Sequence, residues 1–232
     1  MSSQALNEAE IQEDCLLDTK QRLLEAAMRV FSEKGFQGSS MRTITREAGT
    51  SLSAANYHFG SKEELLRSAL AARAELLNAR RIQLLEEASQ GPRGGPELEA
   101  VLEAFIRPVF ERQAEMMARG QVMSGLALRL YLDPHIVVSR IRHDVFEATN
   151  QRFAEALVQA LPGSTEASAL EALRFIPGVV VYAVSEGNEI LQGNSTDGSD
   201  AKSRLERVVT FASAGVRALV GRASSSQKGA MS

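Results

Sequence analysis

The chain has 232 residues, of which 44% are hydrophobic and 24% charged, and its formal net charge is −3. This balance suits one large soluble domain, or a small domain joined to a larger one. We expect no membrane-spanning helix, because no apolar stretch approaches the roughly 20 residues that one needs, and the acidic beginning is unlike a signal peptide. The single cysteine, Cys15, excludes an intrachain disulfide and suits the cytoplasm.

Charge is unevenly distributed along the chain. Residues 1–18 carry five acidic side chains and no basic one, which predicts an acidic N-terminal tail. Residues 19–81 carry 11 Lys or Arg against 6 Asp or Glu, and residues 82–232 carry 15 against 18. The positive charge is therefore local, as expected of a protein that meets phosphate with one end.

The first part of the chain predicts four helices separated by glycines. The first begins at Asp18 or Thr19, either of which can cap free N–H groups, and ends at Gly35. Two short helices follow, one from Ser39 or Ser40 to Gly49 and one from Ser51 to Gly60. A fourth begins with the capping box of Ser61 and Glu64 and runs to about Ser89.

The run Gly91–Pro96 is a clear break, and further helices are expected beyond it. Asp133 and Pro134 form a strong start signal, a cap followed by a proline at the first helical position. The expected ranges are 97–118, 121–132, 134–160, 165–192 and 200–221, followed by a disordered tail over 223–232. With few alternating β-branched runs, the chain is expected to be all-α.

The two short helices, joined at Gly49 and Thr50, have the layout of a helix-turn-helix. In such units the second helix enters the major groove of DNA and the first crosses the backbone. If Ala55 and Phe59 face inward, the outward positions are small or hydrogen-bonding: Ser53, Ala54, Asn56 and Tyr57. This face suits close approach to base edges.

These features resemble the TetR/AcrR family of bacterial transcriptional regulators. The resemblance covers about residues 19–66: Ala26–Ala27 with Phe31, Gly35–Phe36, Met41–Ile44, Ala48–Gly49, Tyr57–Phe59 and Ser61–Leu65. It implies a homodimer with a three-helix DNA-binding domain over 19–66 and a larger helical ligand-binding and dimerisation domain over 67–222. Thr50 and Asn56 depart from the usual valine and tyrosine.

By this resemblance Arg42 would contact a base, and its planar fork matches O6 and N7 of guanine. Phosphate contacts would come from Thr43, Ser51, Tyr57, His58 and Lys62, and base contacts from Leu52, Ser53, Ala54 and Asn56. Plainer interpretations stay open. Arg42 and Lys62 are also consistent with solvated charges, His58 with a packed structural histidine, and Asn56 with a cap or a water-facing side chain.

The last two expected helices carry long apolar stripes beside small residues such as Ala214 and Gly215. Small residues permit close helix packing, so this pair is expected to form the homodimer interface. An internal core stripe is the alternative.

A ligand pocket is expected among the middle helices, where Met and Phe adapt to irregular apolar ligands. The candidate contacts are Phe110, Met123, Leu126, Arg129, Phe146 and Phe175, with His143, Arg152 and Tyr182 as further polar anchors. Plain core packing is the alternative. The run Asn56–Lys62 resembles a sub-branch that includes regulators of fatty-acid metabolism. This favours a small apolar effector, a fatty acyl group first and a multidrug-type aromatic second.

A helical enzyme or a small-molecule-binding protein without DNA affinity is the alternative class. His143, Asp144 and Glu147 share one expected helix, but no second Glu-x-x-His pair accompanies them. No phosphate loop or nucleophile elbow occurs, and the histidines are scattered. We therefore expect no catalysis, metal, cofactor or membrane attachment, and interpret the chain as a cytoplasmic, ligand-responsive repressor that binds a palindromic operator in double-stranded DNA, with an activator as the alternative.

Overall fold

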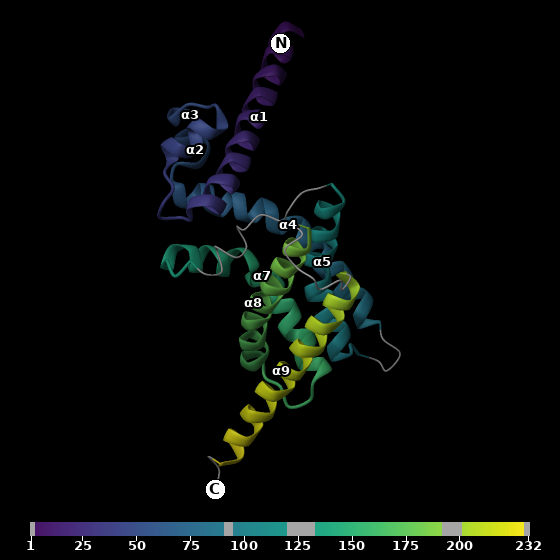
Figure 1. Cartoon of the computed structure of the whole chain (residues 1–232). Helices are drawn as coiled ribbons and strands as arrows, with labels where there is room; N and C mark the ends of the chain where they lie inside the picture. The colour runs from purple at the N-terminus through teal and green to yellow at the C-terminus, as the bar shows by residue number, and fades with distance from the viewer. Residues whose placement is uncertain (1–2, 91–94, 120–132, 192–200, 230–232) are drawn as a thin grey trace. The chain divides into compact units, whose positions relative to one another are not determined.

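The computed structural model describes residues 3–90, 95–119, 133–191 and 201–229, which form α-helices joined by turns, with no β-strand in these ranges (Figure 1). The all-α prediction is confirmed. The helix expected over 121–132 lies outside the described residues. The helices are α1 (Ser3–Lys34), α2 (Met41–Ala48), α3 (Leu52–Phe59), α4 (Lys62–Ser89), α5 (Leu98–Ala118), α7 (Ile136–Ala160), α8 (Glu166–Leu191) and α9 (Ala201–Gly229).

Helix α1 begins at Ser3, so the predicted start at Asp18 or Thr19 was wrong. The residues before Asp18 include Ala, Leu, Glu and Gln and no Gly or Pro, so nothing breaks the helix there. The Asp18 carboxylate lies 3.3 Å from Arg22 Nε, an i,i+4 ion pair within the helix. The predicted end is confirmed, because Gly35 follows Lys34 with a φ of 69°.

The helix-turn-helix forms as the local signals predict. Gly49 has φ 62° and ψ 36°, a left-handed conformation that side-chain-bearing residues avoid, and its N–H donates to the Arg46 carbonyl. The Thr50 N–H donates to the Thr45 carbonyl over 3.0 Å. These two bonds end α2 and turn the chain directly into α3.

The chain divides into two compact units. The first comprises described residues 3–73 and 133–145, and the second 74–90, 95–119, 146–191 and 201–229. Helices α4 and α7 therefore contribute to both units. Sequence analysis predicted another division, by function: an acidic tail, domains over 19–66 and 67–222, and a C-terminal tail. That division stays a prediction.

The core of the first unit joins α1, α2, α3 and the first turns of α4. Each short helix contributes two buried apolar residues, Ile44 and Ala48 from α2 and Ala55 and Phe59 from α3. The main buried side chains are Leu23, Phe31, Ile44, Ala55, Phe59, Leu65 and Leu66. Helix α3 is about 12 Å long and would be marginal without this contact.

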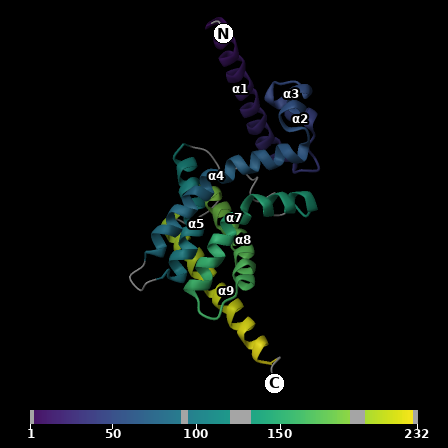
Figure 2. The same ribbon diagram turned by 180° about the vertical axis from the view of Figure 1, so that it is seen from behind.

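In the second unit α5 packs against α8 and α9, and α8 against α9 (Figure 2). The rings of Phe105 and Phe153 meet edge to face with their centroids 5.0 Å apart. Pro108 lies inside α5, where it removes one N–H from the helical ladder. Near this proline, Arg81 of α4 donates from Nε to the Phe105 carbonyl over 2.9 Å, and its guanidinium lies 4.0 Å from the Phe105 ring centroid.

A second arginine ties α4 to α5. Arg80 donates from Nε and from a terminal nitrogen to the two carboxylate oxygens of Glu111, each over 3.0 Å. The hydrogen bond from Arg80 is the main reason that the pKa of Glu111 lies below its ordinary value. The half of α4 that belongs to the second unit is therefore fixed to α5 on both sides of Pro108.

Two later helix bounds differ from expectation. Helix α7 begins at Ile136, two residues later than predicted, because the Asp133 carboxylate accepts from the His135 N–H and the first helical bond runs from Ser139 to the His135 carbonyl. Helix α9 reaches Gly229, beyond the end expected at residue 221, and the disorder expected over 223–232 stays a prediction. The serines there lower helix propensity only modestly, and no proline ends the helix.

Helix α8 corrects the hydropathy prediction. Its residues Glu166–Ser185 have a mean hydropathy of 1.5 and are long and apolar enough to cross a membrane by length and composition alone. The inner face of the helix belongs to the core, with Ile176 and Val180 buried. Its outer face carries Phe175 and Tyr182, both exposed in the single chain. Because α8 is apolar on two sides, the periodicity of its sequence alone did not identify it as a long apolar segment.

The departure at Thr50 predicts a stabilising substitution. Thr50 Oγ is buried and has no hydrogen-bond partner, and a buried unpaired hydroxyl costs about 1–3 kcal/mol. We expect Thr50→Val, which keeps the shape of the side chain, to raise the free energy of unfolding by about 1 kcal/mol in denaturant melts.

The matched control is Thr45→Val in α2. Thr45 is also buried, but its hydroxyl donates to the Arg42 carbonyl over 3.1 Å. The control substitution therefore removes a hydrogen bond and is expected to lower stability or leave it unchanged. Equal effects of the two substitutions would contradict the account of Thr50.

Candidate nucleic-acid interface

Both short helices begin with the same arrangement of hydroxyl groups. Ser40 Oγ accepts from the Thr43 N–H over 3.1 Å and lies 2.9 Å from Thr43 Oγ. Ser51 Oγ accepts from the Ala54 N–H over 3.1 Å and lies 2.9 Å from Ser53 Oγ. Each cap uses one N–H of the first turn and leaves earlier N–H groups of the helix without an intrahelical acceptor, a place where anions bind.

The outer face of α3 carries the residues that were predicted to meet bases. Ser53, Asn56 and Tyr57 are exposed, Tyr57 to 77%, and Leu52 is 36% exposed. Ala54 is half-buried at the edge of this face, while Ala55 and Phe59 point into the core as predicted. Leu52, Ser53, Asn56 and Tyr57 thus share one accessible side of the helix, and the plainer alternative in which Asn56 only meets water stays open here.

Arg42 lies in the first turn of α2 and is exposed. Among the described residues neither it nor Arg46, four positions further along, has a side-chain hydrogen bond or ion pair. By contrast, the nearby Glu47 is engaged by Arg29 of α1 over 3.1 Å. The two unpaired cations of α2 are therefore available to DNA, and the one carboxylate of α2 is neutralised.

His58 is placed as its plainer alternative described. The residue is half-buried, its Nε2 atom is buried without a partner, and its ring lies 5.3 Å from that of Tyr57 and 6.1 Å from that of Phe59. A phosphate contact through Nε2 does not fit this placement. Tyr57, which is exposed beside it, retains the predicted role without obstruction.

Lys62 differs most from expectation. Its ammonium group donates to the carbonyls of Phe36 and Ser39 over 2.8 and 3.0 Å and lies 4.2 Å from the Phe36 ring centroid. Desolvation by burial lowers the pKa of Lys62, against an opposing effect of Glu63. Lys62 therefore holds the turn between α1 and α2 in place, a role that sequence analysis did not consider, and its phosphate contact stays a prediction.

The start of α7 joins this same cluster. The His135 ring lies 5.3 Å from that of Phe36, and Arg67 of α4 donates to the Asp144 carboxylate over 2.8 Å. Sequence reasoning missed both contacts, because they link positions far apart in the chain and have no local signal. They also explain Asp144, which the catalytic alternative had considered, as a structural ion-pair partner.

The expected pocket residues of the second unit are divided. Phe110 is buried and Phe146 half-buried, as a pocket or a core requires. Phe175 was wrongly placed, because it is 61% exposed on the outer face of α8; Tyr182, His143 and Arg152 are exposed as well. Met123, Leu126 and Arg129 lie outside the described residues. Within those residues no cluster of three His, Cys, Asp or Glu side chains forms a metal site.

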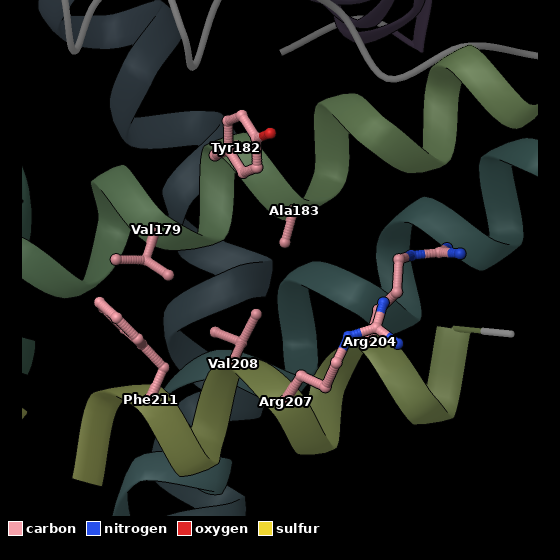
Figure 3. A pocket seen from close by; sticks show the side chains of 7 residues that line it. All are labelled: Val179, Tyr182, Ala183, Arg204, Arg207, Val208 and Phe211. Atoms are coloured by element: carbon pink, nitrogen blue, oxygen red, sulfur yellow. The ribbon is translucent and has the colours of Figure 1, made fainter. Parts of the chain in front are cut away.

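A shallow hollow lies on the surface between α8 and α9 (Figure 3). Tyr182 of α8 and Phe211 of α9 project along its sides, and both are largely exposed. The lining residues are Val179, Tyr182, Ala183, Arg204, Arg207, Val208 and Phe211. Tyr182, which sequence analysis considered as a polar anchor of an interior pocket, thus lies on this outer surface.

Known proteins match both parts of the chain. Residues 23–69 match the family model described as bacterial regulatory proteins, tetR family, and residues 103–215 match the one described as tetracyclin repressor-like, C-terminal domain. The chain is 44% identical over 61 residues to the nicotine-responsive transcriptional repressor HdnoR of Paenarthrobacter nicotinovorans, covering 26% of this chain and 30% of that protein. It is 31% identical over 111 residues to the transcriptional regulator TtgW of Pseudomonas putida, covering 47% and 76%.

A solved structure of the fatty acid degradation regulator FadR from Bacillus halodurans has a similar fold, with a TM-score of 0.59 at 16% identity over 86% of this chain and 96% of that one. The matched proteins are transcriptional regulators. These matches exclude the alternative that the chain is a helical enzyme.

Arg42 and Lys62 are expected to act differently in DNA binding. Arg42→Ala should cost about 1–3 kcal/mol at the preferred duplex and relax selectivity at one base pair per half-site. Lys62→Ala should lower the melting temperature of the protein and weaken all duplexes to the same degree, because it loosens the turn before α2. Competition assays with duplex libraries measure both, and identical selectivity profiles for the two variants would refute this division of roles.

Proposed function

The chain belongs to the TetR family of bacterial regulatory proteins, and on that premise we propose that it is a ligand-responsive repressor that binds a palindromic operator as a homodimer. The observation that carries the proposal is the outer face of α3, uncharged and accessible beside the unpaired Arg42 and Arg46. A regulator of this kind acts in the cytoplasm. Repression is favoured over activation by the likeness to HdnoR, a repressor.

The proposed dimer sets the symmetry of the operator. Two copies related by a two-fold axis present two α3 helices, each suited to a major groove. The operator is then an imperfect palindrome whose half-sites lie about one helical turn, or a multiple of it, apart.

The outer faces of α8 and α9 support a dimer through these helices. Phe175 and Tyr182 on α8 and Phe211 on α9 are 61%, 69% and 65% exposed. An exposed apolar surface of this kind marks an interaction site. The surrounding residues are small, with Gly178 on α8 and Ala214, Gly215 and Ala218 on α9 also exposed.

The glycines make the argument sharper. A Cβ atom added at Gly178 or Gly215 would meet nothing within 4 Å in the single chain. Glycine in a helix costs about 1 kcal/mol relative to alanine, so packing within the chain gives no reason for glycine there. A second helix packed closely against these positions does give one, and a second copy of the chain is the occupant that supplies it.

The proposed effector site has Phe110 and Phe146 of the second unit as its described contacts, and Met123, Leu126 and Arg129 rest on sequence alone. Asn78 of α4 adds a feature that sequence analysis did not consider, because its amide oxygen is buried without a partner. Phe110 and Phe146 suit the apolar body of a ligand, whereas the Asn78 oxygen needs a hydrogen-bond donor, which an acyl carboxylate or ester does not carry and a bound water or another ligand group would have to supply. A fatty acyl compound is the first candidate and a multidrug-type aromatic the second.

The effector works through a difference in affinity. A ligand releases DNA only if its affinity is higher for the dimer geometry that does not fit the operator than for the geometry that does. By linkage, operator DNA must lower effector affinity by the same factor. This reciprocity distinguishes a true effector from a compound that merely binds the unit.

The charge distribution predicts a steep salt dependence of operator affinity. If each protomer neutralises about three phosphates, the logarithm of affinity against that of salt concentration should have a slope on the order of −5 for the dimer. Titrations of a preferred duplex at graded salt measure the slope. A slope near zero would exclude the proposed mode of DNA binding.

The dimer proposal predicts that two unrelated changes have the same result. Phe211→Glu places a charge on the apolar face, and Gly215→Leu adds bulk where the single chain has open space. Both should give a folded monomer in sedimentation experiments and weaken operator binding at a given protein concentration.

Leu76→Glu is the control, because Leu76, like Phe211, is a large exposed apolar residue but lies on α4. It should leave the dimer intact. Dimers that persist in both Phe211→Glu and Gly215→Leu would show that the interface lies elsewhere.

The effector proposal predicts a dependence on acyl chain length. Burial of about ten methylenes supplies roughly 8 kcal/mol before the costs of association, which is enough to oppose a moderate operator affinity. Acyl chains of graded length should raise the melting temperature of the free dimer and release the operator in parallel. Release by aromatic compounds alone would favour the second candidate.

A further inference from the structure

The recognition face of α3 has a chemical character that points to particular bases. We propose that Leu52 and Asn56 together read A·T base pairs, with a thymine methyl group against Leu52 and the major-groove edge of adenine on the Asn56 amide, and that Arg42 reads a guanine beside them. This inference rests on the proposed operator binding and specifies which DNA the same surface accepts.

The four accessible residues of α3 form two i,i+4 pairs on its outer side. Leu52 and Asn56 make one pair, and Ser53 and Tyr57 the other. Leu52 and Asn56 therefore present an apolar group and an amide side by side. In the major groove an A·T pair offers the matching combination, a methyl group on thymine and an acceptor with a neighbouring donor on adenine.

The serine hydroxyl groups near this face are already engaged. Ser51 caps α3 through the Ala54 N–H, and Ser53 lies 2.9 Å from Ser51. The Asn56 side chain, in contrast, has no partner among the described residues. It is therefore the free polar group best able to make the two hydrogen bonds that adenine N6 and N7 require.

The composition of α3 argues against guanine or cytosine beneath it. Guanine is read most often by Arg or Lys, and cytosine by Asp or Glu. None of these occurs within Leu52–Phe59, all of which the structure describes, and the Nε2 atom of His58 is buried. Guanine recognition falls instead to Arg42 on α2, which is exposed and unpaired.

Leu52 supplies the most specific part of the inference. It is the first residue of α3 and is 36% exposed although it is large and apolar. Thymine is the only base that carries a methyl group in the major groove. Leu52 lies at the N-terminal end of α3, which enters the groove first. It therefore has one complementary partner among the four bases, the thymine that carries this methyl group.

The test begins with the wild-type dimer and a duplex selected from a random library. Each thymine of one half-site is then replaced by deoxyuridine, which removes only the methyl group. Replacement at the contacted position should weaken binding about fourfold, the value of one buried methyl group. On that modified duplex Leu52→Ala should cause no further loss, whereas on the thymine duplex it should cause a similar loss.

Asn56 is tested with purine analogues at each adenine. Removal of the N6 amino group or replacement of N7 by carbon should weaken wild-type binding by about 5- to 150-fold at one position and have little effect on Asn56→Ala. Leu76→Ala is the control for both series, because its leucine is exposed on another helix.

The outcomes separate the two levels of the argument. If no duplex is selected, the proposed function fails. If a duplex is selected and bound, but uracil replacement has no effect at any position or Leu52→Ala weakens all duplexes alike, the operator function stands and the A·T inference is overturned. Melting temperatures confirm that the variants remain folded.

Discussion

The shortness of α3 constrains everything else at the interface. A helix of eight residues is not stable by itself, so it exists because Ala55 and Phe59 are buried, Ser51 caps one end and Gly60 ends the other. These four positions are required for the fold, so they cannot be changed to alter DNA recognition. The exposed positions, 52, 53, 56 and 57, are not needed for the fold, and in the proposed operator complex these four side chains contribute selectivity together with Arg42.

Lys62 supplies the second support of this arrangement. Its ammonium group satisfies two carbonyls of the turn before α2 and lies against the Phe36 ring, which offsets the desolvation that lowers its pKa. In the proposed operator complex, Arg42, Arg46 and the helix N-termini supply positive charge to DNA, since the Lys62 ammonium group is engaged within the chain. This explains how a chain with a net charge of −3 presents a DNA-binding face: few cations are needed where each is well placed.

Local signals predicted the first unit well, because caps and glycines act within a few residues. Ser40, Gly49 and Ser51 each stand where their own hydrogen bonds or φ values require them. The failures share another cause. The start of α1 depended on the absence of a breaker before Asp18, and a capping residue was mistaken for a boundary. The contacts of Lys62 and the Arg67–Asp144 ion pair depend on chain segments that no local pattern connects.

Phe175 shows a different limit of sequence reasoning. Periodicity identified it as apolar but could not decide which side of α8 it occupies, because α8 is apolar on two sides. The structure separates these sides: Ile176, Val180 and Ala183 are buried, while Phe175 and Tyr182 face outward.

In the proposed dimer this double use of α8 has a mechanistic consequence. One helix then lines the core of the second unit and also carries the face that meets the partner. An effector that rearranges the inner side of α8 acts directly on the pairing face, and a change on the outer face must in turn alter effector affinity. Substitutions on the outer face of α8, such as Tyr182→Glu, are therefore expected to affect effector binding even though Tyr182 lies on the surface of a single chain. The coupling needs no long pathway through the fold, because α8 would face the effector site on one side and the second protomer on the other.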